Sequence, residues 1–107
     1  MVAQTIAGAV KRYLHTVNDN GVSVKFGVVF GSSVSGKCDK WSDIDLIVVS
    51  PKFDAKRKRR DIDLLWRLAP QVDSRIEPIP CGVKQWQEDD SSTIIEAARR
   101  TGKKILM

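Results

Sequence analysis

Apolar and polar positions follow two different periods along the first half of the chain, and each period predicts one kind of element. Apolar residues recur at three- and four-residue steps over 2–17, which predicts an amphipathic helix. β-branched residues are frequent over 22–30, and this stretch is expected to form a strand. A polar loop with a short helical turn over 33–40 then leads to a second predicted strand over 43–50.

The second half of the chain continues this alternation. A helix is predicted over 54–69 and should end at Pro70. Its apolar face is expected to consist of Ile62, Leu65, Trp66 and Ala69. Residues 72–80 predict a third strand, which its prolines confine to a sheet edge or a strand end. A turn with no regular element is expected over 81–90.

The C-terminal stretch predicts one more helix. Thr93 and Glu96 have the spacing of a capping box, so the helix should run over 93–101 with Gly102 as its C-cap. Its buried face is expected to contain Ile94, Ile95 and Ala98. Residues 103–106 predict a short terminal strand.

Together these elements, in the order αβαβαβα, predict an α/β (α+β) fold class with a small mixed β-sheet of three to four strands flanked by helices. We expect one domain spanning residues 1–107. A chain of this size buries roughly 60 to 70% of its unfolded surface, which is enough for a modest core. Hydrophobic residues make up 42% and charged residues 29%, which argues against disorder.

Charge and cysteine content narrow the possible partners and cofactors. The net charge of +5 favours anionic partners such as nucleotides, RNA or an acidic protein surface. Cys38 and Cys81 are far apart and the chain has a single histidine, so no zinc site is predicted and both thiols should be reduced. No stretch approaches the about 18 apolar residues of a membrane span. We therefore expect a cytoplasmic protein with no membrane partner.

The residues best suited to chemistry are two aspartates at the start of the second predicted strand. Asp43 and Asp45 are two residues apart, so in a strand their carboxylates point to the same face. Adjacent carboxylates repel and raise one another's pKa unless a cation lies between them, and magnesium is the most plausible cation. Upstream, Gly31 and Ser32 follow a strand, where glycine lets the backbone approach a phosphate. Ser42 could hydrogen-bond an aspartate or a phosphate.

This arrangement of Gly31-Ser32, ten further residues and Asp43-Ile44-Asp45-Leu46 resembles the signature of the DNA polymerase β-like nucleotidyltransferase superfamily. The likeness is greatest to its minimal single-domain members and extends loosely over the remaining elements. The family loop often reads Gly-Ser-x-Ala-Arg-Gly, whereas residues 33–36 lack that arginine. Lys37 is the available substitute.

The resemblance implies a magnesium-dependent transfer of a nucleoside monophosphate, with AMP from ATP the first choice, to a hydroxyl acceptor. Asp43 and Asp45 would hold two magnesium ions, while Gly31, Ser32 and Ser42 would bind the nucleotide. A third carboxylate on the strand after the intervening helix would complete the metal site and accept the acceptor's proton. Glu77 matches that place best by spacing, and Asp73 is the alternative.

Minimal members of this superfamily commonly act as homo-oligomers or with a helical HEPN-type partner, as antitoxins that add AMP to that partner.

Two other interpretations stay open. One is a non-enzymatic module that binds a nucleotide or a partner toxin, which the missing loop arginine favours. The other is a basic RNA-binding domain built around 52–60, where six of nine residues are basic. That stretch is equally typical of a solvated helix surface. His15 has no neighbouring partner pattern, and we assign it no role.

Overall fold

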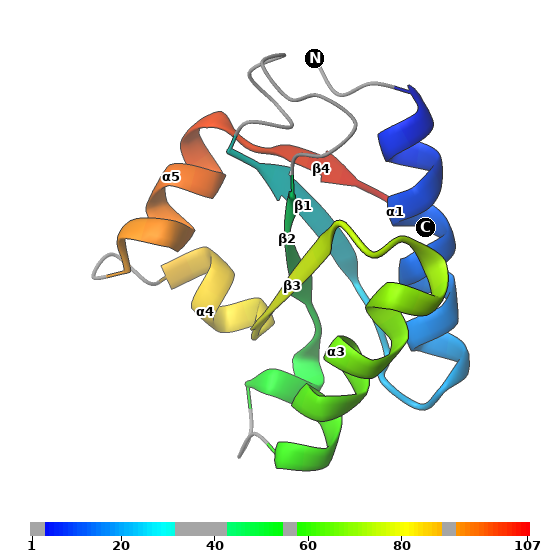
Figure 1. Cartoon of the computed structure of the whole chain (residues 1–107). Helices are drawn as coiled ribbons and strands as arrows, with labels where there is room; N and C mark the ends of the chain where they lie inside the picture. Colours follow the sequence, from blue (N-terminus) through cyan, green and yellow to red (C-terminus); the bar gives the residue numbers. More distant parts are fainter. Residues whose placement is uncertain (1–3, 32–42, 55–57, 89–91) are drawn as a thin grey trace.

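A β-sheet with helices on both faces organises the chain (Figure 1). The computed structural model describes residues 4–31, 43–54, 58–88 and 92–107. Their elements follow in the order α1-β1-β2-η1-α3-β3-α4-α5-β4. The short helical turn predicted over 33–40 lies outside the described residues. None of the described helices has the length and apolar character needed to cross a membrane.

The sheet is mixed, with the strand order β3-β2-β1-β4 within the described ranges. The strands are β1 (Phe26–Phe30), β2 (Ile44–Val49), β3 (Ile76–Cys81) and β4 (Lys103–Ile105). The central strand β1 pairs antiparallel with β2 and β4, whereas β2 and β3 are parallel. The predicted fold class, a mixed sheet of three to four strands flanked by helices, is confirmed.

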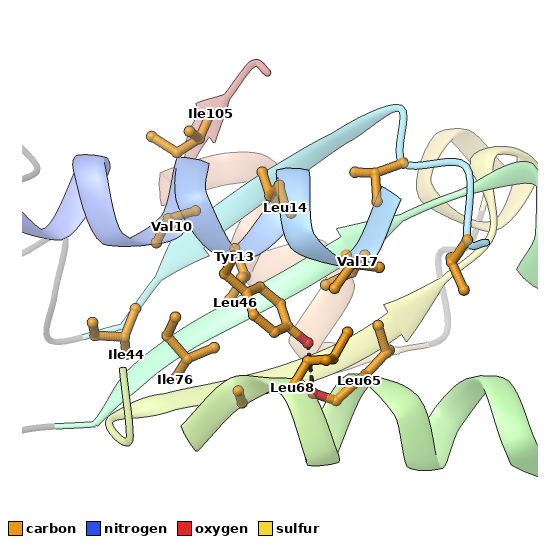
Figure 2. Close-up of a cluster of buried hydrophobic side chains, with 14 of the residues drawn as sticks. Val10, Tyr13, Leu14, Val17, Ile44, Leu46, Leu65, Leu68, Ile76 and Ile105 are labelled. Atoms are coloured by element: carbon orange, nitrogen blue, oxygen red, sulfur yellow. Dashed lines mark hydrogen bonds between the residues drawn. The ribbon is translucent and has the colours of Figure 1, made fainter. Parts of the chain in front are cut away.

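The larger core layer lies between the sheet and helices α1 (Gln4–Asp19) and α3 (Arg59–Val72). Because side chains alternate along a strand, the even-numbered residues of β2 point into this layer. Its fully buried members include Val10, Leu14, Val17, Ile44, Leu46 and Leu65. Figure 2 shows Tyr13 of α1 among these side chains, with its hydroxyl donating a 2.8 Å hydrogen bond to the Leu65 carbonyl of α3. Burial without a counter-charge raises the pKa of the Tyr13 hydroxyl.

The second layer covers the other face of the sheet. Helices α4 (Val83–Glu88) and α5 (Thr93–Thr101) pack here against odd-numbered residues of β2 such as Ile47. Trp86 of α4 meets Phe26 of β1 edge to face, with ring centroids 5.9 Å apart. Asp45 lies between two residues that face the larger layer, so it belongs to the α4–α5 side of the sheet.

Helix α3 differs from its prediction in its ends and in its buried face. It continues through Pro70 to Val72. Pro70 is exposed and lies in the last turn, where water can hydrate the carbonyl that loses its N–H partner. The buried stripe consists of Asp61, Leu64, Leu65, Leu68 and Ala69. Trp66, predicted to be buried, is 50% exposed, because the stripe through Leu64 and Leu68 packs against α1 instead.

Helix α4 replaces the irregular turn predicted over 81–90, and a distant side chain caps it. The Asp54 carboxylate accepts hydrogen bonds of 2.9 Å from the backbone N–H groups of Val83 and Lys84. A Cβ at Gly82 would collide with that carboxylate, so glycine is required beside the cap. The predicted turn was wrong because its cap comes from a residue about 30 positions earlier in the chain.

Helix α5 has its predicted bounds and its predicted C-cap at Gly102. Its N-cap, however, is Ser92, whose hydroxyl accepts a hydrogen bond from the Ile95 N–H at 3.4 Å. The predicted N-cap at Thr93 was therefore wrong by one residue, and Ile95 rather than Glu96 occupies the N3 position, so the predicted capping box does not form. Ile94, predicted to be buried, is 49% exposed, while Ile95 and Ala98 are buried as expected.

Strand β3 lies at an edge of the sheet, as its prolines predicted. The backbone N–H groups of residues 76, 78 and 80 point away from β2. This follows because the carbonyls of Arg75 and Cys81 accept hydrogen bonds from Ile44 of β2 and from Ser50 directly after that strand. Two of these positions are prolines, and the Ile76 N–H bonds to the Asp73 carbonyl at 3.1 Å. The β3 edge therefore offers no free N–H to an added strand.

Candidate functional site

The predicted acidic residues meet where β1 ends and where β2 and β3 begin. Asp45 is paired across the sheet with Phe30 of β1 on one side and with Glu77 of β3 on the other. Asp43 directly precedes β2, and Gly31 directly follows β1. The fold thus brings four of the predicted site residues to one end of the sheet. Ser32 and Ser42 lie outside the described residues, as does the Lys37 loop.

Two of these carboxylates, Asp45 and Glu77, have raised pKa values, and the charge of Asp43 contributes to both. Burial raises the pKa of Asp45 above its ordinary value, the Asp43 charge raises it further, and a hydrogen bond with Glu77 partly opposes the rise. Burial also raises the pKa of Glu77, and the charges of Asp43 and Asp45 and hydrogen bonds with both act in the same direction. The three groups therefore form one coupled cluster, called here the carboxylate cluster.

Because these pKa values are raised, the carboxylate cluster destabilises the folded state at neutral pH. A group whose pKa is higher in the folded state than in the unfolded state stabilises the fold most below its unfolded pKa. That contribution is lost as the pH rises through the folded pKa. With Asp45 and Glu77 both ionised, their repulsion opposes folding, and a bound cation would relieve it.

The backbone turn after β1 approaches one of these carboxylates closely. Gly31 has a φ of 76°, a conformation that side chains other than glycine rarely adopt. A Cβ built at this position would lie 2.7 Å from Asp45 Oδ2. Glycine is thus needed twice at residue 31, for the turn itself and for the space beside Asp45.

The donor chemistry of the carboxylate cluster fits magnesium. Carboxylate oxygens are the hard ligands that Mg²⁺ uses in proteins. Asp43 and Asp45, with Glu77 beside them, are the side chains that could hold such an ion. Across the described ranges, no three His, Cys, Asp or Glu side chains are already arranged as a metal site, so Glu77 would have to shift toward the two aspartates when an ion binds.

The alternative third carboxylate, Asp73, is engaged elsewhere. It is the C-cap residue of α3 rather than part of β3. Its oxygens accept hydrogen bonds from Arg75 Nε at 3.0 Å and Nη2 at 2.8 Å. Hydrogen bonding by that side chain holds the pKa of Asp73 below its ordinary value. The geometry therefore favours Glu77 over Asp73 as a member of the carboxylate cluster.

A basic residue also reaches this end of the sheet, although no pattern in the sequence connected it with the site. Lys103 of β4 is paired with Val29 of β1, two residues before Gly31. The sequence predicted the terminal strand and the basic character of 103–106, but the register of β4 on β1 depends on the whole fold. Lys103 is exposed and so adds positive charge near the glycine turn.

A mixed sheet whose strand ends bring two aspartates beside a glycine turn is the arrangement expected of a nucleotidyltransferase domain. The chain belongs to the nucleotidyltransferase domain family, whose model matches residues 10–100. The predicted resemblance is confirmed at this level. No curated protein sequence matches the chain.

Solved structures with the same fold include components of toxin–antitoxin systems. One is a toxin–antitoxin with AMP-PNP, at TM-score 0.61 and 21% identity over 92% of this chain and 71% of that one. A second is a putative nucleotidyltransferase from Sulfolobus solfataricus, at TM-score 0.57 and 16% identity over 76% and 70%. A third is a tri-AMPylated Shewanella oneidensis HEPN toxin in complex with MNT antitoxin, at TM-score 0.55 and 18% identity over 91% and 68%. At these identities the likeness concerns the fold alone.

Proposed function

We propose that this protein is a magnesium-dependent nucleotidyltransferase that moves a nucleoside monophosphate, AMP from ATP, to a hydroxyl acceptor. The observation that carries the proposal is the carboxylate cluster where β2 and β3 begin, in which Asp45 and Glu77 have raised pKa values. Groups perturbed in this way cluster at functional sites. Family membership supports the same class of reaction.

Asp43, Asp45 and Glu77 are the residues that would hold two magnesium ions. Bound there, magnesium would offset the charge of the triphosphate and lower the pKa of the acceptor hydroxyl. The Gly31 turn and Ser32 would bind the phosphates, because a glycine turn lets backbone N–H groups approach an anion. Ser42 would hydrogen-bond an aspartate or a phosphate beside them.

In the transfer step, the acceptor oxygen bonds to the α-phosphorus while the bond from that phosphorus to the bridging oxygen breaks and pyrophosphate leaves. The acceptor's proton goes to the Glu77 carboxylate. A raised pKa suits Glu77 to this role, because a base works best when its pKa lies nearer the working pH. The protein acts by placing and neutralising charged groups rather than through a covalent intermediate.

The acceptor hydroxyl is proposed to belong to a partner protein. A structure with the same fold is the MNT antitoxin in complex with a tri-AMPylated HEPN toxin. By analogy we propose that this chain works in the cytoplasm as a homo-oligomer or with a helical HEPN-type partner, and that it modifies that partner.

Label transfer from α-labelled ATP tests the proposal. The chain is co-expressed with the product of its adjacent reading frame, and incorporation of label into that product is measured with and without Mg²⁺. We expect labelling that requires Mg²⁺ and is abolished by Asp45→Asn and by Glu77→Gln. Asp73→Asn is the matched control, since Asp73 is paired with Arg75, and it should leave labelling intact.

Two outcomes would contradict this assignment. Labelling by the Asp45→Asn protein would show that the carboxylate cluster is not the site of transfer. Mg²⁺-dependent ATP binding without any labelling would favour the second candidate, a nucleotide-binding module that acts on its partner sterically. The absence of the family's arginine in residues 33–36 is the sequence observation that favours that second candidate.

A further inference from the structure

A pocket lies at the other end of the sheet from the carboxylate cluster. Its volume is about 490 Å³, and the turn at Asn20 and Gly21 forms part of its wall together with Lys52 and the first turns of α3. Asp45 lies near the start of β2, whereas Lys52 follows the end of that strand. The first turn of α3 lies at the opposite end of the molecule from the end of β1 (Figure 1). A volume of this order is typical of ligand sites.

One lysine of this pocket, Lys52, contacts both the turn after α1 and helix α3. Lys52 Nζ donates a hydrogen bond of 2.9 Å to the Gly21 carbonyl and lies 3.8 Å from Asp61 Oδ1. Asp61 is only 6% exposed, so the charge of Lys52 serves mainly to offset a buried carboxylate. The Lys52–Asp61 pair therefore ties α3 to the turn after α1 and leaves no net charge.

The remaining charges of the pocket are predominantly positive. Asp63 is offset by Arg59, with Arg59 Nε 3.7 Å from Asp63 Oδ2. Arg60 and Arg67 also line the pocket, and neither has an ion pair or a side-chain hydrogen bond within the described part of the chain. They are seven residues apart, or about two helical turns and 10 Å, on one face of α3. Two uncompensated guanidinium groups thus face the same open space.

This chemistry suits phosphate groups better than a protein surface. Guanidinium groups bind phosphate oxygens in a bidentate manner, which a single lysine cannot do. Leu64 is the apolar side chain in the pocket wall, whereas the centre of a protein interface is usually apolar. A positively charged groove that follows successive phosphates is typical of proteins that bind single strands.

We propose that the Arg60–Arg67 pocket binds the phosphate backbone of a single-stranded nucleic acid. The ligand would bind at the opposite end of the sheet from the carboxylate cluster, so this proposal does not depend on the proposed transfer.

Fluorescence anisotropy with a labelled 12-nucleotide single-stranded RNA tests this proposal. The wild-type chain is compared with Arg60→Gln/Arg67→Gln over a range of salt concentrations. Each lost phosphate contact reduces the salt slope of log K by about 0.7 for a single strand, so two lost contacts reduce it by about 1.4, or about 25-fold in affinity at 0.1 M salt.

The matched control is Lys84→Gln/Arg100→Gln, which removes the same net charge from exposed positions on α4 and α5. It should keep most of the wild-type affinity, and so should Asp45→Asn. Unchanged thermal unfolding of the Arg60/Arg67 variant would confirm that the fold is intact. The proposal is overturned by equal losses in both double variants, by absence of RNA binding in the wild type, or by tighter binding of a poly-glutamate peptide or of inorganic triphosphate.

Discussion

Substitution of Gly31 by alanine should damage the site through a single added carbon atom. Two separate penalties apply at this position. The backbone has a φ of 76°, which is costly for any residue with a Cβ. The new Cβ would also lie 2.7 Å from Asp45 Oδ2, closer than real Cβ atoms approach a neighbour.

The two penalties have different sizes and different consequences. The left-handed conformation costs about 1–2 kcal/mol. For a domain of this size that corresponds to a decrease in Tm of about 4–16 °C. The contact with Asp45 costs less, because the carboxylate is the end of a side chain and can move by roughly 0.5 Å. A displacement of that order equals the tolerance of a catalytic group, so transfer should fall by about 10- to 100-fold.

Gly21→Ala separates these effects. Gly21 also has a positive φ, of 101°, but a Cβ there would meet nothing within 4 Å. Thermal unfolding should therefore show comparable destabilisation in both variants, while label transfer should fall only in Gly31→Ala. If both variants kept equal transfer activity at a temperature where both are folded, the close approach of Gly31 to Asp45 would have no functional role.

Three further predictions concern stability. Asp45→Asn relieves the repulsion within the carboxylate cluster, so the variant should have a higher Tm than the wild type in the absence of Mg²⁺. Addition of Mg²⁺ should raise the Tm of the wild type only. A lower Tm for the variant without Mg²⁺ would contradict this prediction. Asp73→Asn should cost about 1 kcal/mol in urea unfolding at pH 7 through the lost pair with Arg75. The pKa of Asp73 is lowered in the folded state, so the difference in unfolding free energy between wild type and variant is complete above the unfolded pKa of about 3.9. This difference should disappear as the pH falls through the folded pKa. A difference that grew in acid would refute the stabilising role of the Asp73–Arg75 pair. Tyr13→Phe should cost about 1–2 kcal/mol by leaving the buried Leu65 carbonyl without its side-chain donor, and a neutral effect in chemical unfolding would show that the hydrogen bond contributes nothing.

The sequence predicted those parts of the fold that depend on local periodicity. The two-residue period correctly placed Asp45 on the face of β2 opposite Ile44 and Leu46, and Asp43 directly precedes that strand. Prolines correctly placed β3 at an edge. These inferences succeeded because each depends on the geometry of one strand and not on its neighbours.

Features that depend on packing between distant segments could not be predicted. Two overlapping apolar stripes run along α3, and only contact with α1 decides that Leu64 and Leu68 are buried while Trp66 is exposed. The Asp54 cap on α4 joins residues about 30 positions apart. Glu77 could be placed by spacing, but its position beside Asp45 follows from the parallel register of β2 and β3, which the sequence does not specify.

The central claim is that the carboxylate cluster binds a divalent cation and, through that cation, a nucleotide. Titration calorimetry of ATP into the wild type and into Asp45→Asn, each with and without Mg²⁺, tests it without any knowledge of the acceptor. We predict saturable binding only for the wild type with Mg²⁺ present. Equal ATP affinity without Mg²⁺, or unchanged affinity in the Asp45→Asn protein, would contradict the claim.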